Sequence, residues 1–284
     1  MIYKSAITDN YALRAVALES NFISNGVKSI VSFFPSLLKS VSKGFAKAED
    51  IKQFVPAQAD NNLERLNKTE QAIADALIWM PYDDIAMLRL PVPEGFTGNY
   101  CKYFAQLLEM FSYHEQTALP AIEEYYISIA AIITNKDAKL SLKDNTIKYK
   151  ALSKSREENN KEIAKHFNAS SIAEYAYGKL FLNNQEVTQA FKLMHQLERT
   201  LISTKVASVT DQVVKITNAL QTLISMAENG TIENLSPAQL KNLSEGAYEI
   251  AAQVEFFAIN YYRAQVAINS LKDATQKLTM RLED

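Results

Sequence analysis

The sequence predicts an all-α protein, an elongated helical bundle with a long antiparallel C-terminal helical hairpin and a short extended Pro-rich insert. Three observations lead to this prediction. The 284 residues include seven glycines, far below the roughly 7 % of average proteins, which disfavours turn-rich β architecture. Apolar residues recur at steps of three and four along most of the chain, which is the periodicity of a helix face. Three of the seven prolines are concentrated in one segment, 80–96.

The N-terminal lobe, residues 1–135, is predicted to consist of shorter helices around the insert. Asp9 and Asn10 are suitable N-caps for the helix that follows them. Segments 62–79 and 99–134 also have helical periodicity. The second of them is interpreted as two helices or as one helix bent at Pro120, because proline removes a helical hydrogen bond.

Residues 22–45 form an amphipathic segment that allows two interpretations. Its apolar face is opposed by a face of mostly Ser and Lys, and no acidic residue occurs from Asn21 to Ala48. Such a helix lies on a membrane surface in some proteins, and in others it buries its stripe in the protein's own core. We favour core packing, because that is the ordinary role of an amphipathic helix. If the protein contacts a membrane, 22–45 is the one segment suited to that contact.

The insert 80–96 interrupts the helical pattern. Pro91 and Pro93 prevent a regular helix and permit extended backbone. We expect a short arm or hairpin that crosses the bundle or adds to the sheet edge of a partner. An active-site loop is less well supported, because the segment contains no histidine or nucleophile. The candidate partner-docking residues are Leu88, Leu90, Val92 and Phe96.

Residues 136–183 are predicted to form a polar helical connector. Between positions 136 and 165 there are nine basic and five acidic residues and few apolar ones. A nucleic-acid-binding face would need aromatic platforms or a dense arginine cluster, which this stretch lacks. A solvated connector helix is therefore the better interpretation, and specific reading of nucleic acid is not expected.

The C-terminal region, residues 184–284, is predicted to be an antiparallel hairpin of two helices, over 185–228 and 236–282. Each would be about 65–70 Å long at 1.5 Å per residue. Ser236 and Pro237 mark the start of the second helix as N-cap and first helical residue, and Asn229 with Gly230 supplies a C-terminal stop for the first. The first series contains one slip of register, and Gly246 is the one weak helix former inside the second. The seam of the second helix starts from Leu240 and comprises Leu243, Ala247, Ile250, Val254, Phe257, Tyr261, Ala264, Ile268, Leu271, Thr275, Leu278 and Leu282.

A search of the sequence for chemistry assigns no catalytic, cofactor-binding or metal-ligating residue. Phosphate-binding glycine loops, nucleophile elbows and paired Glu-x-x-His motifs do not occur. The three histidines, His114, His166 and His195, lie on separate predicted helices, so satisfied or surface histidines are expected. Cys101 is the single cysteine, and 30 basic against 32 acidic residues give a net charge of −2. The sequence therefore favours a non-enzymatic protein, and its N-terminal residues resemble no export signal.

Three segments taken together resemble the all-helical virion structural proteins of large contractile-tailed bacteriophages. They are the insert ending in LPVPEGF, the polar stretch SLKDNTIKYKALSKSREE and the helix LSEGAYEIAAQVEFFAINYYRA. The resemblance implies a structural virion component of the head, neck or tail, made in a bacterial host cytoplasm. Its implied partners are other virion proteins and copies of itself. Two alternatives remain: a membrane-active helical bundle, such as a toxin that exposes 22–45, and a helical scaffold or adaptor.

Overall fold

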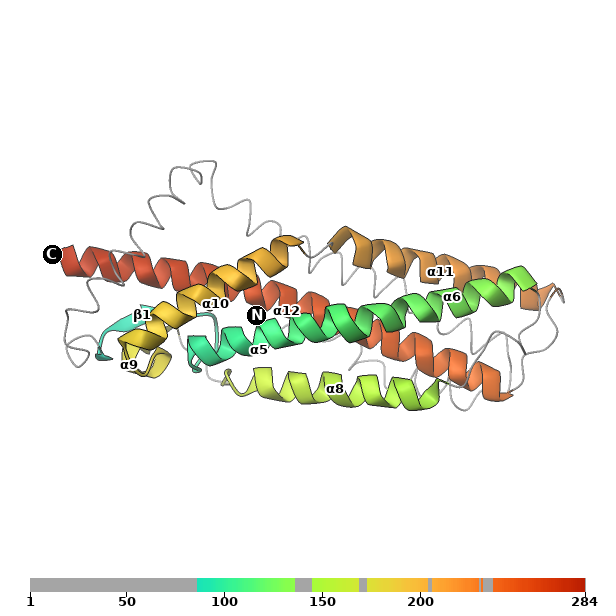
Figure 1. The fold of residues 1–284 in the computed structure, drawn as a ribbon, viewed down its shortest axis with the longest axis horizontal. Coiled ribbons are helices and arrows are strands. Elements are labelled where there is room, and N and C mark those ends of the chain that lie inside the picture. Colours follow the sequence, from blue (N-terminus) through green and yellow to red (C-terminus); the bar gives the residue numbers. More distant parts are fainter. Residues whose placement is uncertain are drawn as a thin grey trace.

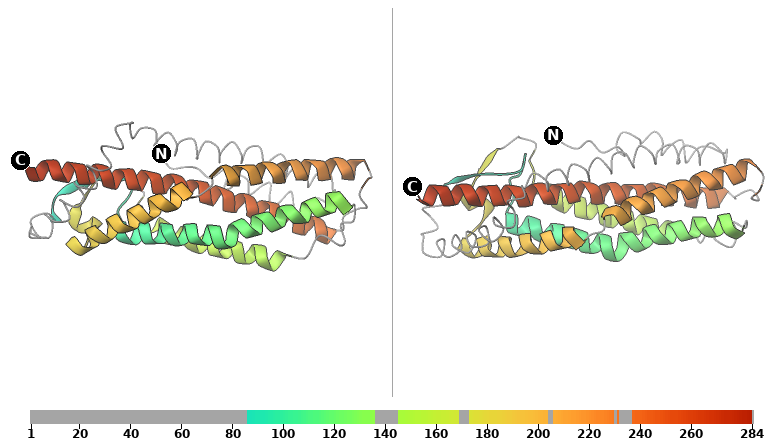
Figure 2. Two further views of the ribbon diagram at one scale, coloured as in Figure 1. Left: turned by 45° about the horizontal axis from the view of Figure 1, so that its top comes forward. Right: turned by 90° about the horizontal axis from the view of Figure 1, so that it is seen from above.

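The computed structural model describes residues 86–135, 145–168, 173–203, 206–229, 231 and 237–283. Long α-helices in these ranges run along one axis, and a small two-stranded sheet lies at the end that also holds the C-terminal helix end (Figures 1 and 2). The predicted all-α class is confirmed. The helices expected before residue 80, including segment 22–45, and the first residues of the insert lie outside the described residues.

The elements follow the chain from the insert to the C-terminus. They are β1 (Arg89–Pro91), α5 (Tyr100–Tyr113), the π-helical turn η2 (His114–Ala118), α6 (Leu119–Asn135), α8 (Thr146–Ala164), β2 (Glu174–Ala176), α9 (Tyr177–Leu180), α10 (Asn184–Ser203), α11 (Val206–Glu228) and α12 (Pro237–Glu283).

Helices α5 and α6 are joined by η2 into one bent helical run (Figure 1). In a regular α-helix the ring of Pro120 would clash with the carbonyl of Gln116. The π turn directly before Pro120 widens the backbone, and the Leu119 N–H donates to His114 O, five residues back. The bend foreseen at Pro120 is thus a π turn within a continuous helical run.

Helix α12 is the central helix of the described bundle. It is 47 residues long, or about 70 Å at 1.5 Å per residue, and it contacts β1, α5, α6, α8 and α10. Pro237 is its first residue, as predicted. Every predicted seam residue from Leu243 to Leu278 is buried, and the stretch 251–258 is buried on all sides. A helix buried around its whole circumference needs partners beyond one hairpin arm, and α5 and α8 are two of them.

The prediction of one helix over 185–228 is wrong. The structure has α10 and α11 there, both running opposite to α12 (Figure 1). α10 packs chiefly on α5 and α11 chiefly on α6, and α5 and α6 are themselves out of phase because of η2. A single uninterrupted apolar stripe over 185–228 could not face both α5 and α6. The slip of register in the sequence therefore coincides with the change of packing partner from α5 to α6. The Thr231 N–H donates to Met226 O at 2.9 Å, which is the closing bond of a Schellman motif.

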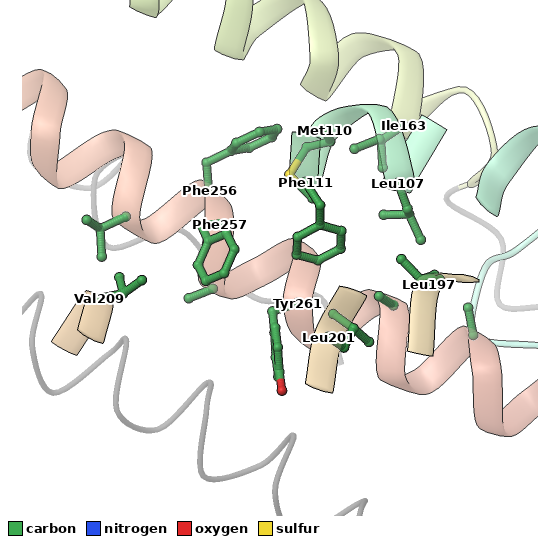
Figure 3. Close-up of a cluster of buried hydrophobic side chains, with 14 of the residues drawn as sticks. Leu107, Met110, Phe111, Ile163, Leu197, Leu201, Val209, Phe256, Phe257 and Tyr261 are labelled. Atoms are coloured by element: carbon green, nitrogen blue, oxygen red, sulfur yellow. The ribbon is translucent and has the colours of Figure 1, made fainter. Parts of the chain in front are cut away.

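Aromatic and aliphatic side chains from several helices meet around the middle of α12 (Figure 3). The Phe111 and Phe257 rings are perpendicular, with centroids 5.7 Å apart. Leu201 of α10 and Val209 of α11 lie beside the same aromatic group. The rings at 256, 257 and 261 therefore fill a core, which is the usual role of aromatic residues at helical spacing.

The polar segment 136–183 forms a helix, α8, over part of its length. Tyr149, Leu152 and Ile163 are buried, and α8 packs on α12 and α5, so it is a structural member of the bundle. Its outer side is charged, with an exposed Lys154–Glu158 pair. Farther along, Glu174–Ala176 is a strand, because its backbone pairs with β1.

Candidate functional site

The sheet end of the bundle, which comprises β1, β2, α9 and the loops beside them, holds the residues that the sequence analysis singled out for docking. β1 and β2 pair antiparallel, with Leu90 opposite Tyr175. The pairing extends beyond the strands: Val92 N–H donates to Ala173 O, and Tyr177 N–H donates to Leu88 O. The extended part of the insert therefore pairs with a second strand of the same chain, β2.

The loop after β1 is closed against the end of α8. Gly95 has φ of 75°, and a Cβ there would lie 2.8 Å from Asn168 O, so glycine is required at this position. Asn168 N–H donates to Gly95 O at 2.7 Å, and Thr97 N–H donates to His166 O at 2.9 Å. The loop is thus held by main-chain bonds that no side-chain pattern in the sequence indicates.

The structure buries two of the four candidate docking residues, Leu90 and Phe96, inside the chain itself. Leu90 is 2 % exposed and Phe96 is fully buried, both within this chain's own core. Leu88 and Val92 are half-buried and pack against the same core. In this conformation Leu90 and Phe96 pack within the chain's own core, because the insert pairs with the strand that precedes α9.

One edge of β1 is covered by α12. In this antiparallel pattern the backbone groups of Arg89 and Pro91 point away from β2. Pro91 has no N–H, and its carbonyl accepts from Ser270 Oγ at 3.4 Å. Ser270 Oγ in turn accepts from the Tyr100 hydroxyl at 3.3 Å. The outer edge of the sheet is therefore that of β2, where Glu174 is exposed.

Two large apolar side chains beside this sheet are exposed, and sequence reasoning missed both. Met87, just before β1, is 82 % exposed, and Leu182, just after α9, is 60 % exposed. The apolar pattern did not distinguish them from buried neighbours such as Leu90, because their exposure depends on how the insert folds back. Because they are exposed, they are better placed for contact with another molecule than Leu90 or Phe96.

A compact aromatic cluster lies beneath the sheet. Phe96 lies 4.8 Å from Tyr100 and 5.3 Å from Tyr103, measured between ring centroids. His166 stacks on Phe96 at 6.3 Å, and a ring nitrogen of His166 lies 2.7 Å from Gln106 Oε1. Gly98 allows this approach, since a Cβ there would lie 2.2 Å from His166 Nδ1. Burial first, and then the nearby Lys102, lowers the pKa of His166.

Arg263 and Tyr103 are the polar groups of this cluster with the fewest partners. The guanidinium of Arg263 lies over the Phe167 ring at 5.7 Å, and its hydrogen bond to Asn260 Oδ1 is long at 3.5 Å. The Tyr103 hydroxyl is buried and has no hydrogen-bond partner among the described residues. Burial raises the pKa of Tyr103 and lowers that of Arg263. This arrangement stabilises ring packing and includes no nucleophile–base pair.

The remaining histidines lie apart from this cluster. His114 is buried at the junction of α5 and α6. His195 Nδ1 lies 3.2 Å from Glu198 Oε2, and Lys272 of α12 donates to the other Glu198 oxygen. Burial alone would raise the pKa of Glu198, but the hydrogen bonds from His195 and Lys272 outweigh it and lower the pKa. This ion cluster joins α10 to α12.

Within the described ranges, no group of three His, Cys, Asp or Glu side chains is arranged to hold a metal ion. No helix in the described part of the chain combines the length and the apolar character needed to cross a membrane. The chain matches no protein family model, no curated protein and no solved structure.

Proposed function

We propose that this chain is a non-enzymatic structural component of a tailed-bacteriophage virion, in the head, neck or tail. It acts by packing against other virion proteins and against copies of itself. The assignment to a virion is supported by the sequence resemblance to helical virion proteins of contractile-tailed phages. The shape and surface of the bundle support the mode of action.

The observation that carries the contact role is the spread of exposed apolar side chains along the bundle. A single exposed apolar residue needs no explanation. Here such residues occur beside the sheet, at the end of α10, within α6 and at the start of α8, and so along the whole length of the described bundle. Lateral packing of neighbouring subunits would cover them. They are Met87, Leu182, Ile202, Ile127 and Ile147, each more than half exposed.

The scaffold is also suited to transmitting contacts over a distance. The central helix α12 spans about 70 Å, and α5, α6, α8 and α10 are packed against it. The near-zero net charge of −2 permits close approach of copies without strong mutual repulsion. An elongated, nearly neutral rod of this kind favours repeated side-by-side assembly.

Quantitative mass spectrometry of gradient-purified virions and of the matching infected-cell lysate tests the proposal. We expect this chain to be enriched with the capsid and tail proteins, in a fixed copy number per particle. A phage replication protein that is abundant in the lysate serves as the control and should be absent from particles. Abundance in the lysate with absence from purified particles would overturn the virion assignment.

A second experiment, vesicle flotation, distinguishes the virion proposal from the membrane-active alternative. The purified protein is floated on a density gradient with vesicles of anionic phosphatidylglycerol and neutral phosphatidylcholine. The virion proposal predicts that the protein stays at the bottom of the gradient. Co-flotation that is lost on deleting 22–45 would instead support the membrane-active interpretation.

A further inference from the structure

The π turn η2 places a histidine in the apolar interior of the bundle. His114 is the first residue of η2, and its ring stacks on Phe257 of α12 with centroids 3.9 Å apart and planes 20° apart. The His114 Nε2 atom is buried and has no hydrogen-bond partner among the described residues. Phe111, which is 5.7 Å from Phe257, closes another side of the same group (Figure 3). A ring nitrogen without a partner in this setting is a poor place for a positive charge.

The same residue lies where the helical run is weakest. Its N–H is shared between Met110 O and Phe111 O, and its carbonyl accepts the π-type bond from Leu119 N–H. Pro120 follows and contributes no N–H of its own. π turns are rare and occur frequently at functional sites of helices. The junction therefore combines an irregular backbone with a titratable side chain that packs on the central helix.

We propose that η2 is an acid-sensitive joint, at which uptake of one proton by His114 drives the imidazole out of its contact with Phe257 and releases the junction of α5 and α6 from α12. α5 packs on α10 and α6 packs on α11. Opening at η2 would therefore let one half of the bundle change its angle relative to the other. The inference does not depend on where the protein acts.

The electrostatics of the site set the direction of this response. Burial lowers the pKa of His114 from 6.5 to about 4, because an imidazolium ion there would lose hydration without gaining an acceptor. The face of Phe257 attracts a cation but does not replace the lost water. No other cause contributes to the pKa shift of His114. Tyr113 and Glu115 flank His114 in the sequence, and Glu123 of α6 and Glu255 and Tyr261 of α12 are titratable residues on the helices that contact η2.

The sign of the pH dependence follows from linkage. The folded state binds the proton more weakly than the unfolded state, so the stabilising effect of neutral His114 is fully present above pH 6.5. It is lost as the pH falls from 6.5 toward 4 and changes no further below that. In this window the unfolding equilibrium constant rises by up to about tenfold per pH unit, on the order of 10²-fold in total.

The test compares the full-length protein with His114→Phe by urea unfolding at several pH values from 7 to 4.5. Phe keeps a ring against Phe257 but binds no proton. We expect the wild-type unfolding constant to increase, relative to that of the variant, by on the order of 10²-fold across this range. The control Phe257→Leu weakens the stacking and retains the titrating group, so it should be destabilised at every pH with the wild-type slope. An unchanged pH slope in His114→Phe would overturn the proposal.

A second measurement needs no variant. Hydrogen exchange of the wild-type protein, corrected for the intrinsic pH dependence of exchange, should show residues 110–120 losing protection on acidification before the central part of α12 does. Simultaneous loss of protection in both segments would mean that acid unfolds the whole bundle without a joint at η2. Retained protection of 110–120 at pH 4.5 would equally contradict the proposal.

Discussion

Arg156 of α8 and Glu249 of α12 form a two-point ion pair inside the bundle. Arg156 Nε lies 3.2 Å from Glu249 Oε1, and Arg156 Nη2 lies 3.2 Å from Oε2. Gln253 Nε2 also donates to Glu249 Oε1 at 2.8 Å and to Leu152 O at 3.1 Å. The bidentate geometry fixes both the position of α8 along α12 and its rotation about its own axis. The weakly amphipathic sequence of α8 does not specify either of these.

We expect Arg156→Ala to lower the free energy of unfolding by about 2–3 kcal/mol, because it leaves the buried Glu249 carboxylate without its counter-charge. Urea unfolding at pH 7 measures this loss. The double variant Arg156→Met with Glu249→Met should lose less than the sum of the two single variants. Lys154→Ala, which removes an exposed pair with Glu158, is the control and should change stability by less than about 1 kcal/mol. Equal losses for Arg156→Ala and Lys154→Ala would contradict a structural role for the buried pair.

Gly246→Ala is expected to destabilise the protein, although the same change in an exposed helix interior stabilises by about 1 kcal/mol. A Cβ at 246 would lie 2.6 Å from Tyr125 Cε2 and 2.7 Å from the Tyr149 hydroxyl oxygen. Both rings pack against α12 here, and the Tyr125 hydroxyl donates to Leu243 O. We expect a loss of about 1–3 kcal/mol in thermal or urea unfolding, as for an overpacked core. Gly246→Ala should cost less in a Tyr149→Ala background than in the wild-type protein, because one of the two clashing rings is then absent. A more stable Gly246→Ala protein would exclude the close approach.

The insert provides a prediction that separates packing from docking. Leu90→Ala should cost about 2–4 kcal/mol of stability, because Leu90 is 2 % exposed and its removal leaves a cavity. Met87→Ser, three residues earlier and 82 % exposed, should leave the unfolding free energy within about 0.5 kcal/mol. It should weaken incorporation into particles, as measured by mass spectrometry of virions. Normal stability of Leu90→Ala would restore the interpretation of the insert as a free docking arm.

A matched pair of substitutions tests the seam of α12. Val254→Asp places an unpaired carboxylate at a fully buried position, which costs several kcal/mol against a total stability of roughly 5–15 kcal/mol. Val214→Asp makes the same change on α11 at a position that is 38 % exposed. We expect the helical circular-dichroism signal at 25 °C to be largely lost in the first variant and kept in the second. Equal melting temperatures for the two variants would refute the seam.

The helical class and the start of α12 follow from local features that the sequence carries. Apolar steps of three and four, the scarcity of glycine and the helix-initiating Pro237 each act within a few residues along the chain. The resulting seam from Leu243 to Leu278 is buried as predicted. A slip of register in the apolar series marks the break between α10 and α11 in the sequence. It does not show that α10 packs on α5 and α11 on α6.

The candidate site depended on information that is not local. The sequence by itself determined that the insert is extended, because Pro91 and Pro93 exclude a helix. Tertiary structure decided which side chains of the insert are buried, since β2 lies some 85 residues later in the chain and pairs with β1. It also explained the glycine at 246, which is a weak helix former by propensity and a necessity where Tyr125 and Tyr149 approach α12. Periodicity reports which face of a helix or strand is apolar, and three-dimensional contacts alone decide what covers that face.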